Sequence, residues 1–89
     1  MRIDYSRPFL KQLRKTPVEV RKVFQSRLDL FVSNPHHPLL RNHKLTGKYQ
    51  GCRSINITGD WRAIYEERDE LFEPYILFLT LGTHNQLYR

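Results

Sequence analysis

The residues most informative about the fold are Arg53-Ser54-Ile55-Asn56-Ile57-Thr58-Gly59-Asp60-Trp61-Arg62-Ala63-Ile64-Tyr65. The apolar residues of this stretch recur at every second position on both sides of a turn, which is typical of paired strands. With a three-residue loop over 58–60, Ile57 lies opposite Trp61 and Ile55 lies opposite Ala63. The odd-numbered positions then form an apolar face that other elements must cover.

The even-numbered positions of the same stretch form a half-polar face. Asn56 lies opposite Arg62 on this face, and Ser54 lies opposite Ile64. The alternation predicts strands over 52–57 and 61–66, with a third strand over 75–81 after an acidic turn over 67–74. On that third strand we expect one apolar row and one polar position. The row is Leu77, Leu79 and Leu81, and the polar position is Thr80.

The residues before this sheet predict a short strand and two helices. A strand is expected over 2–5, followed by a helix that Ser6 caps and that ends near Lys15. Thr16-Pro17-Val18-Glu19 is typical of a capping box, and the helix after it should run to about Asn34. Residues 35–51 form a long connection. We therefore predict one α+β domain over 1–89, with two N-terminal helices packed on a small antiparallel-rich sheet.

The charge of the chain is unevenly distributed. The 89 residues carry a net charge of +6, with thirteen basic and four acidic side chains over 1–65. Residues 66–73 carry five acidic side chains and one Arg, a net of −4. A basic body with one acidic segment favours a polyanionic partner, nucleic acid first, although charge also serves solubility alone.

Composition excludes several classes of protein. The single cysteine, Cys52, cannot form an internal disulfide, which is typical of a reducing cytosol. No apolar run approaches the length of a membrane span, and Met1-Arg2-Ile3-Asp4 does not open a signal peptide. We expect a cytoplasmic protein with no membrane contact. His36 and His37 have no acidic or cysteine partner nearby, so we expect neither a metal ion nor another cofactor.

Four motifs follow one another in a specific order: His43-Lys44-Leu45-Thr46-Gly47, then 51–57, then 59–65, then Leu81-Gly82-Thr83-His84. This order resembles the RelE/YafQ branch of toxins from bacterial type II toxin–antitoxin systems, in the RelE/ParE superfamily. The resemblance implies a microbial-ribonuclease-like fold and a ribosome-dependent mRNA endonuclease, or mRNA interferase. It also implies metal-independent cleavage of mRNA in the ribosomal A site, and a cognate antitoxin as partner.

The resemblance also implies site residues. YafQ-like members use residues that match His43, Asp60, Trp61, His84 and Tyr88, and RelE-like members use an Arg that matches Arg62. We predict a catalytic set of His43, Asp60, Arg62 and His84. We predict RNA contacts from Lys44, Trp61 and Tyr88.

RNA chemistry supports the same residue types independently. RNA carries its own nucleophile, the 2′-hydroxyl, so the protein needs a base, an acid for the leaving 5′-oxygen and a cation for the phosphate. Histidine suits both proton-transfer roles, since it titrates near neutrality. We favour His84 as general acid, and His43 is equally compatible with a base or proton relay and with a loop hydrogen bond. Asp60 either orients a histidine, acts as base or simply forms the turn. Trp61 is also compatible with a place in the core.

Two departures from the family pattern leave alternatives open. Asn56 stands where YafQ-like proteins have a further catalytic His, and Thr80 stands where they have an Arg. Arg62 is the residue that can supply the missing charge. The alternatives are a ParE-like toxin that inhibits DNA gyrase, and a non-enzymatic RNA- or ribosome-binding module.

Overall fold

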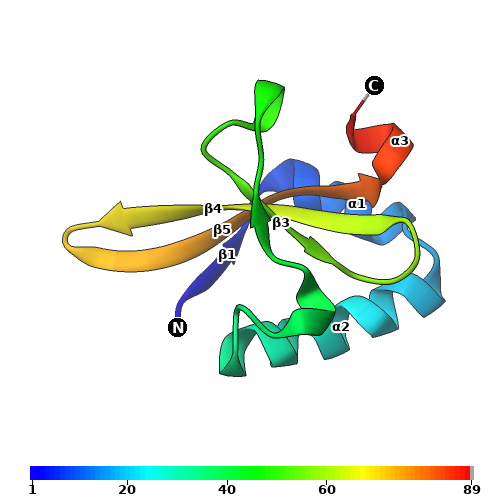
Figure 1. The fold of residues 1–89 in the computed structure, drawn as a ribbon, viewed down its shortest axis with the longest axis horizontal. Coiled ribbons are helices and arrows are strands. Elements are labelled where there is room, and N and C mark those ends of the chain that lie inside the picture. The colour runs from blue at the N-terminus through cyan, green and yellow to red at the C-terminus, as the bar shows by residue number, and fades with distance from the viewer. Residues whose placement is uncertain (89) are drawn as a thin grey trace.

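A computed structural model describes residues 1–88. Its centre is a five-stranded mixed sheet with the strand order β1-β5-β4-β3-β2. The strands are β1 (Ile3–Tyr5), β2 (His43–Lys44), β3 (Arg53–Asn56), β4 (Trp61–Glu70) and β5 (Glu73–Thr83). The helices are α1 (Arg7–Lys15), α2 (Val18–Ser33) and α3 (His84–Leu87), with 3-10 turns η1 (Pro38–Leu40) and η2 (Gly47–Tyr49). Figure 1 shows this arrangement, which confirms the predicted α+β class.

Local signals set the ends of the two N-terminal helices. The Ser6 hydroxyl accepts a hydrogen bond from the Phe9 amide over 3.1 Å, which confirms the predicted cap of α1. The predicted capping box at Thr16 is wrong, because the Thr16 hydroxyl donates to the Gln12 carbonyl at the end of α1. Pro17 instead stands at the N-cap of α2, without a side-chain hydrogen bond. No helix among residues 1–88 has the length and hydropathy to cross a bilayer.

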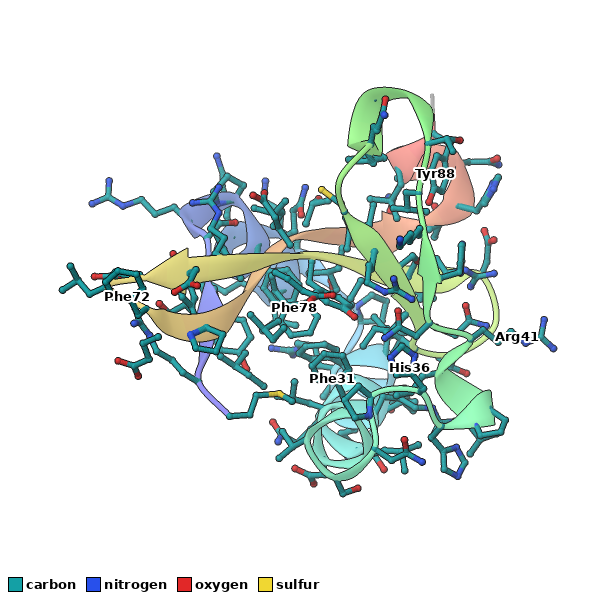
Figure 2. The ribbon with its side chains drawn as sticks, turned by 60° about the vertical axis from the view of Figure 1, so that its left-hand side comes forward. Phe31, His36, Arg41, Phe72, Phe78 and Tyr88 are labelled. Atoms are coloured by element: carbon teal, nitrogen blue, oxygen red, sulfur yellow. The ribbon has the colours of Figure 1, made fainter. Side chains whose placement is uncertain are left out.

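The pairing of β3 with β4 has the predicted three-residue loop. Ile55 pairs with Ala63, and the Ile57 amide donates to the Trp61 carbonyl over 3.0 Å. The apolar odd-numbered face lies against α1 and α2, as predicted, and Figure 2 shows Phe31 and Phe78 in this core. The buried members of the main core are Phe9, Val20, Phe24, Phe31, Leu40, Ile55, Ile57, Ala63, Tyr65, Phe78 and Leu81.

A bulge corrects the predicted faces of β5. The register between β4 and β5 shifts by one residue near the middle of the pair. One extra residue reverses the alternation of side chains beyond the bulge. Phe78, which is fully buried, and Ile76 therefore take the places in the core that were predicted for Leu77 and Leu79.

The predicted turn over 67–74 is also wrong. β4 and β5 remain paired as far as Glu70 opposite Glu73, so the turn consists of Leu71 and Phe72 alone. The acidic side chains thus lie along two strands. These strand ends were not predicted because water contacts both of their faces, so the sequence shows no apolar alternation there.

The even-numbered face of the sheet carries a second, smaller core. Leu45, Ile64 and Leu87 are buried together there, with Tyr49 and Cys52 packed against them. Two segments, the loop around η2 and helix α3, therefore cover this face, on the side of the sheet opposite the main core (Figure 1). The predicted half-polar surface is reduced to the part that this cover leaves open.

Candidate active site

An open depression of about 410 Å³ remains on the even-numbered face. It brings together five of the seven predicted site residues, from β2, β4 and the C-terminal segment. They are His43, Lys44, Arg62, His84 and Tyr88. Leu45, Thr46 and Ser54 complete the lining. Residues that are forty positions apart in the sequence thus meet on one surface.

Strand β2 places His43 at this depression. His43 pairs with Ser54 at the edge of the sheet, and its ring Nδ1 lies 2.7 Å from the Arg41 carbonyl. A carbonyl only accepts hydrogen bonds, so Nδ1 carries the proton of the neutral ring. Nε2 therefore holds a lone pair and can accept a proton from a bound molecule. Arg41 presents its carbonyl from a left-handed conformation, with φ of 45°.

The residue before His43 fixes this edge of the sheet. The Asn42 amide donates to the Tyr65 hydroxyl over 2.8 Å and to the Pro35 carbonyl over 2.9 Å. Its carbonyl oxygen accepts from Arg53 Nε over 2.7 Å. The last of these bonds gives Arg53 a structural role at this edge of the sheet. The structural role of Asn42 was not predicted from the sequence. A polar residue within a polar connection does not indicate that its side chain bonds to three other residues.

The Arg62 side chain is oriented by backbone carbonyls at the start of its own strand. Its Nη1 donates to the carbonyls of Gly59 and Trp61, over 2.9 and 3.1 Å. Within residues 1–88 no hydrogen bond is formed by Nε or Nη2, so these two donors can receive an anion. Arg62 also borders a second hollow of about 460 Å³ that contains Asn56 and Arg41.

Helix α3 places His84 over the same face. The strand ends one residue earlier, at Thr83, and His84 begins a helix that the sequence pattern does not indicate. Thr83 and Gln86 form a capping box, with hydrogen bonds of 3.3 and 2.8 Å between side chain and backbone. The His84 amide donates to the Asp60 carbonyl over 3.0 Å. His84 is therefore fixed by a folded turn.

Aromatic contacts hold the end of the described chain. The rings of His84 and Tyr88 lie 4.7 Å apart, and the ring of Tyr49 meets that of Tyr88 edge-on at 5.7 Å. The Tyr49 hydroxyl donates to the Leu87 carbonyl over 3.0 Å. Burial is the main cause that raises the pKa of Tyr49, so its phenol stays neutral. Figure 2 shows Tyr88 beside the η2 loop.

Two predicted site residues lie outside the depression. The Asp60 side chain is exposed in the β3–β4 turn, and its backbone carbonyl is what reaches His84. Trp61 is half-buried against the main core and lines a separate hollow of about 360 Å³. Thr80, one of the departures from the family pattern, donates to the Gln12 side chain over 2.6 Å.

Ser54 forms part of the floor of the depression. Its side chain is fully buried, and its hydroxyl has no hydrogen-bond partner within residues 1–88. A buried hydroxyl without a hydrogen bond lowers the free energy of unfolding. Within the same residues no three His, Cys, Asp or Glu side chains are grouped as metal ligands.

Comparison with solved structures shows that the fold is RelE-like. RelE in the archaeal RelE–RelB complex from Pyrococcus horikoshii OT3 superimposes with a TM-score of 0.70, covers 96% of each chain and is 21% identical, which shows the fold. The family model for YafQ, a bacterial toxin of type II toxin–antitoxin systems, matches residues 1–89. The chain belongs to the YafQ toxin family.

Two E. coli structures show the same likeness. YafQ alone is 25% identical over the whole of both chains, with a TM-score of 0.74. YafQ in the DinJ–YafQ toxin–antitoxin complex is 26% identical, with a TM-score of 0.67 over 98% of this chain and 96% of that one. No curated protein matches this sequence.

Proposed function

We propose that this YafQ-family toxin is a ribosome-dependent mRNA endonuclease of the cytoplasm. The observation that supports this most is the meeting of His43, Arg62 and His84 around one open depression. Two histidines and one guanidinium are the groups that cleavage through the 2′-hydroxyl needs. The proposed reaction uses no metal ion and no other cofactor.

In the proposed reaction, His43 is the general base. Its Nε2 takes the proton of the 2′-hydroxyl while the 2′-oxygen attacks the adjacent phosphorus. The bond from phosphorus to the 5′-oxygen breaks, and His84 in its protonated form gives a proton to that oxygen. The products are a 2′,3′-cyclic phosphate and a 5′-hydroxyl. His43 ends protonated and His84 neutral, so proton exchange with water restores both.

The remaining residues bind and orient the RNA. Nε and Nη2 of Arg62 bind the phosphate whose charge rises in the transition state, and they replace the Arg that Thr80 does not provide. Lys44 attracts the backbone, and Tyr88 stacks on a base. Asp60 positions His84 through its carbonyl. Trp61 lines a separate hollow, so it contacts the RNA only if the bound RNA extends into that hollow.

The proposed regulator is a cognate antitoxin protein. DinJ accompanies YafQ and RelB accompanies RelE in the solved complexes of two similar toxins. The thirteen basic side chains over 1–65 favour an acidic antitoxin segment, which would speed association and compete with RNA. Coexpression with the adjacent gene should give a copurifying complex and restore growth.

Cleavage of a defined mRNA tests the proposal. The purified chain is added to ribosomes programmed with that mRNA, and to the same mRNA without ribosomes. Cuts are expected only in the programmed ribosomes, unchanged when manganese and zinc are chelated at fixed magnesium. The new 5′ ends should accept phosphate from polynucleotide kinase without prior dephosphorylation.

Other outcomes would favour the alternatives. Products with a 5′-phosphate would contradict attack by the 2′-hydroxyl. Inhibition of gyrase supercoiling without RNA cleavage would support a ParE-like toxin. Ribosome binding without cleavage would support a non-enzymatic module.

A further inference from the structure

The tip of the β4–β5 hairpin is a two-stranded ribbon that extends beyond the neighbouring strands. β3 pairs with β4 only as far as Tyr65, and β1 pairs with β5 only from Ile76 to Phe78. At about 3.4 Å per residue, the tip at Phe72 extends roughly 14 Å beyond Ile76. Figure 1 shows the hairpin leaving the body along the longest axis, and Figure 2 shows Phe72 at its end.

The turn at this tip is built from two bulky apolar residues. Leu71 is 91% exposed and Phe72 is 99% exposed. Both have a positive φ, of 52° and 66°, in a two-residue turn between Glu70 and Glu73. Bulky side chains rarely adopt this conformation, and Asn-Gly is the preferred pair in such a turn. Neither side chain packs against the fold.

The flanks of the turn are strongly acidic. Glu70 pairs directly with Glu73, an arrangement of like charges that weakens a hairpin. Arg2 bridges to Glu70 and Arg68 bridges to Glu66, while the other acidic side chains of this ribbon have no ion pair within residues 1–88. Residues 66–73 carry a net of −4 on an otherwise basic protein.

Exposed apolar side chains, positive φ angles and a pair of like charges thus occur together at the tip. Each of them lowers the stability of the hairpin, and such a combination is typical of a binding surface. We propose that the tip docks on the ribosome, where Phe72 enters an apolar pocket on a basic protein surface. This inference rests on the proposed function. The negative charge of the tip is repelled by RNA phosphates, so a tip carried by an RNA-bound body turns toward protein. Proteins neutralise nucleic-acid phosphates with Lys and Arg side chains, so a protein bound to RNA offers the tip positive charge.

A second copy of this chain is a less suitable occupant. A tip bound to the basic body of another copy would make a head-to-tail contact, and such contacts extend into open chains unless a rotation closes them. Self-association is therefore treated as an outcome that contradicts the proposal.

The test replaces the turn with the pair that the backbone prefers. Leu71→Asn/Phe72→Gly should melt at the same temperature as the wild type or higher, because it removes the unfavourable conformations. Its affinity for purified ribosomes should fall by about tenfold or more, the usual effect of losing a buried aromatic anchor. Asp69→Asn/Glu73→Gln should weaken binding and reduce its salt dependence. Val32→Asn, at a half-exposed apolar position of α2, is the matched control and should bind as the wild type does.

A photo-crosslinking p-benzoylphenylalanine in place of Phe72 identifies what the tip touches. A crosslink to a ribosomal protein is expected with purified ribosomes. A crosslink to ribosomal RNA or to a second copy of the chain would overturn the proposal. If the wild type cuts ribosome-bound mRNA and the turn variant binds equally well, only the docking proposal fails. If binding depends on the tip and no mRNA is cut, only the nuclease proposal fails.

Discussion

The backbone amide of His84 and the backbone carbonyl of Asp60 form a hydrogen bond of 3.0 Å. The bond ties the first residue of α3 to the turn that precedes Arg62, so the proposed acid and the proposed phosphate ligand lie at the same end of the sheet. It also depends only on backbone atoms. The position of His84 should therefore tolerate changes in the Asp60 side chain.

His84→Ala should lower single-turnover cleavage of ribosome-bound mRNA by roughly 10²–10⁴, the usual contribution of a positioned acid. Its melting temperature should stay close to that of the wild type, because the side chain is exposed. Ribosome affinity, measured in parallel, should persist. Asn85→Ala, the exposed neighbour in α3, is the control and should cleave normally. Loss of affinity together with cleavage would show that His84 positions RNA and transfers no proton.

Asp60→Asn should leave cleavage nearly unchanged, because the variant keeps the carbonyl that anchors His84. A carboxylate that served as the general base would instead cost about 10²–10⁴ in rate on this substitution. The single-turnover assay therefore separates anchoring by the backbone from proton transfer by the side chain. His43→Ala in the same assay should show the large loss.

Arg62→Ala should reduce cleavage by about tenfold or more, because a hydrogen bond to a charged group is worth roughly 1.5–3 kcal/mol. Nη1 also holds the carbonyls of Gly59 and Trp61, so the free energy of unfolding should fall by about 1 kcal/mol. Arg62→Lys keeps the charge and should restore part of the activity. Equal cleavage by all three proteins would remove Arg62 from the phosphate site.

The sequence was sufficient for the β3–β4 register because that hairpin is governed by local alternation and a short turn. Arg53 opposite Tyr65 and Asn56 opposite Arg62 follow from one loop length. The face of Phe78 could not be predicted in the same way. The bulge that buries it lies in the pairing of β4 with β5, and a single extra residue leaves no mark on composition.

The same difference between local and tertiary features applies to the candidate site. RNA cleavage restricts the types of residue at the site, and the resemblance to RelE/YafQ toxins indicated His43, Arg62 and His84 as the particular ones. The sequence could not indicate that β2 and α3 place them together, since strands of two residues and helices of four lie below the length at which a period can be recognised. The bonds of Asn42 are likewise tertiary, joining it to Pro35, Arg53 and Tyr65.

Gly82→Ala should loosen α3 without touching a reacting group. A Cβ at this position would stand 2.9 Å from the Gln86 side-chain oxygen and 3.3 Å from its Cβ. Gln86 must then move and break the capping box, at a cost of about 1 kcal/mol in unfolding free energy. Cleavage should fall as His84 loses its position. The same substitution made on a Gln86→Ala background should cost less, and an equal cost would show that Gln86 is not the obstacle.

Ser54→Ala should stabilise the protein. The Ser54 hydroxyl is fully buried with no partner within residues 1–88, and a buried polar group left unsatisfied costs about 1–3 kcal/mol. Removing the oxygen should raise the urea midpoint at an unchanged denaturant slope. Ser6→Ala is the matched control, because it makes the same chemical change where the hydroxyl accepts from Phe9 and donates to the Leu79 carbonyl. That variant should lose about 1 kcal/mol. The two substitutions should therefore shift the midpoint in opposite directions. A lower midpoint for Ser54→Ala would show that a bound water satisfies the hydroxyl at the floor of the depression.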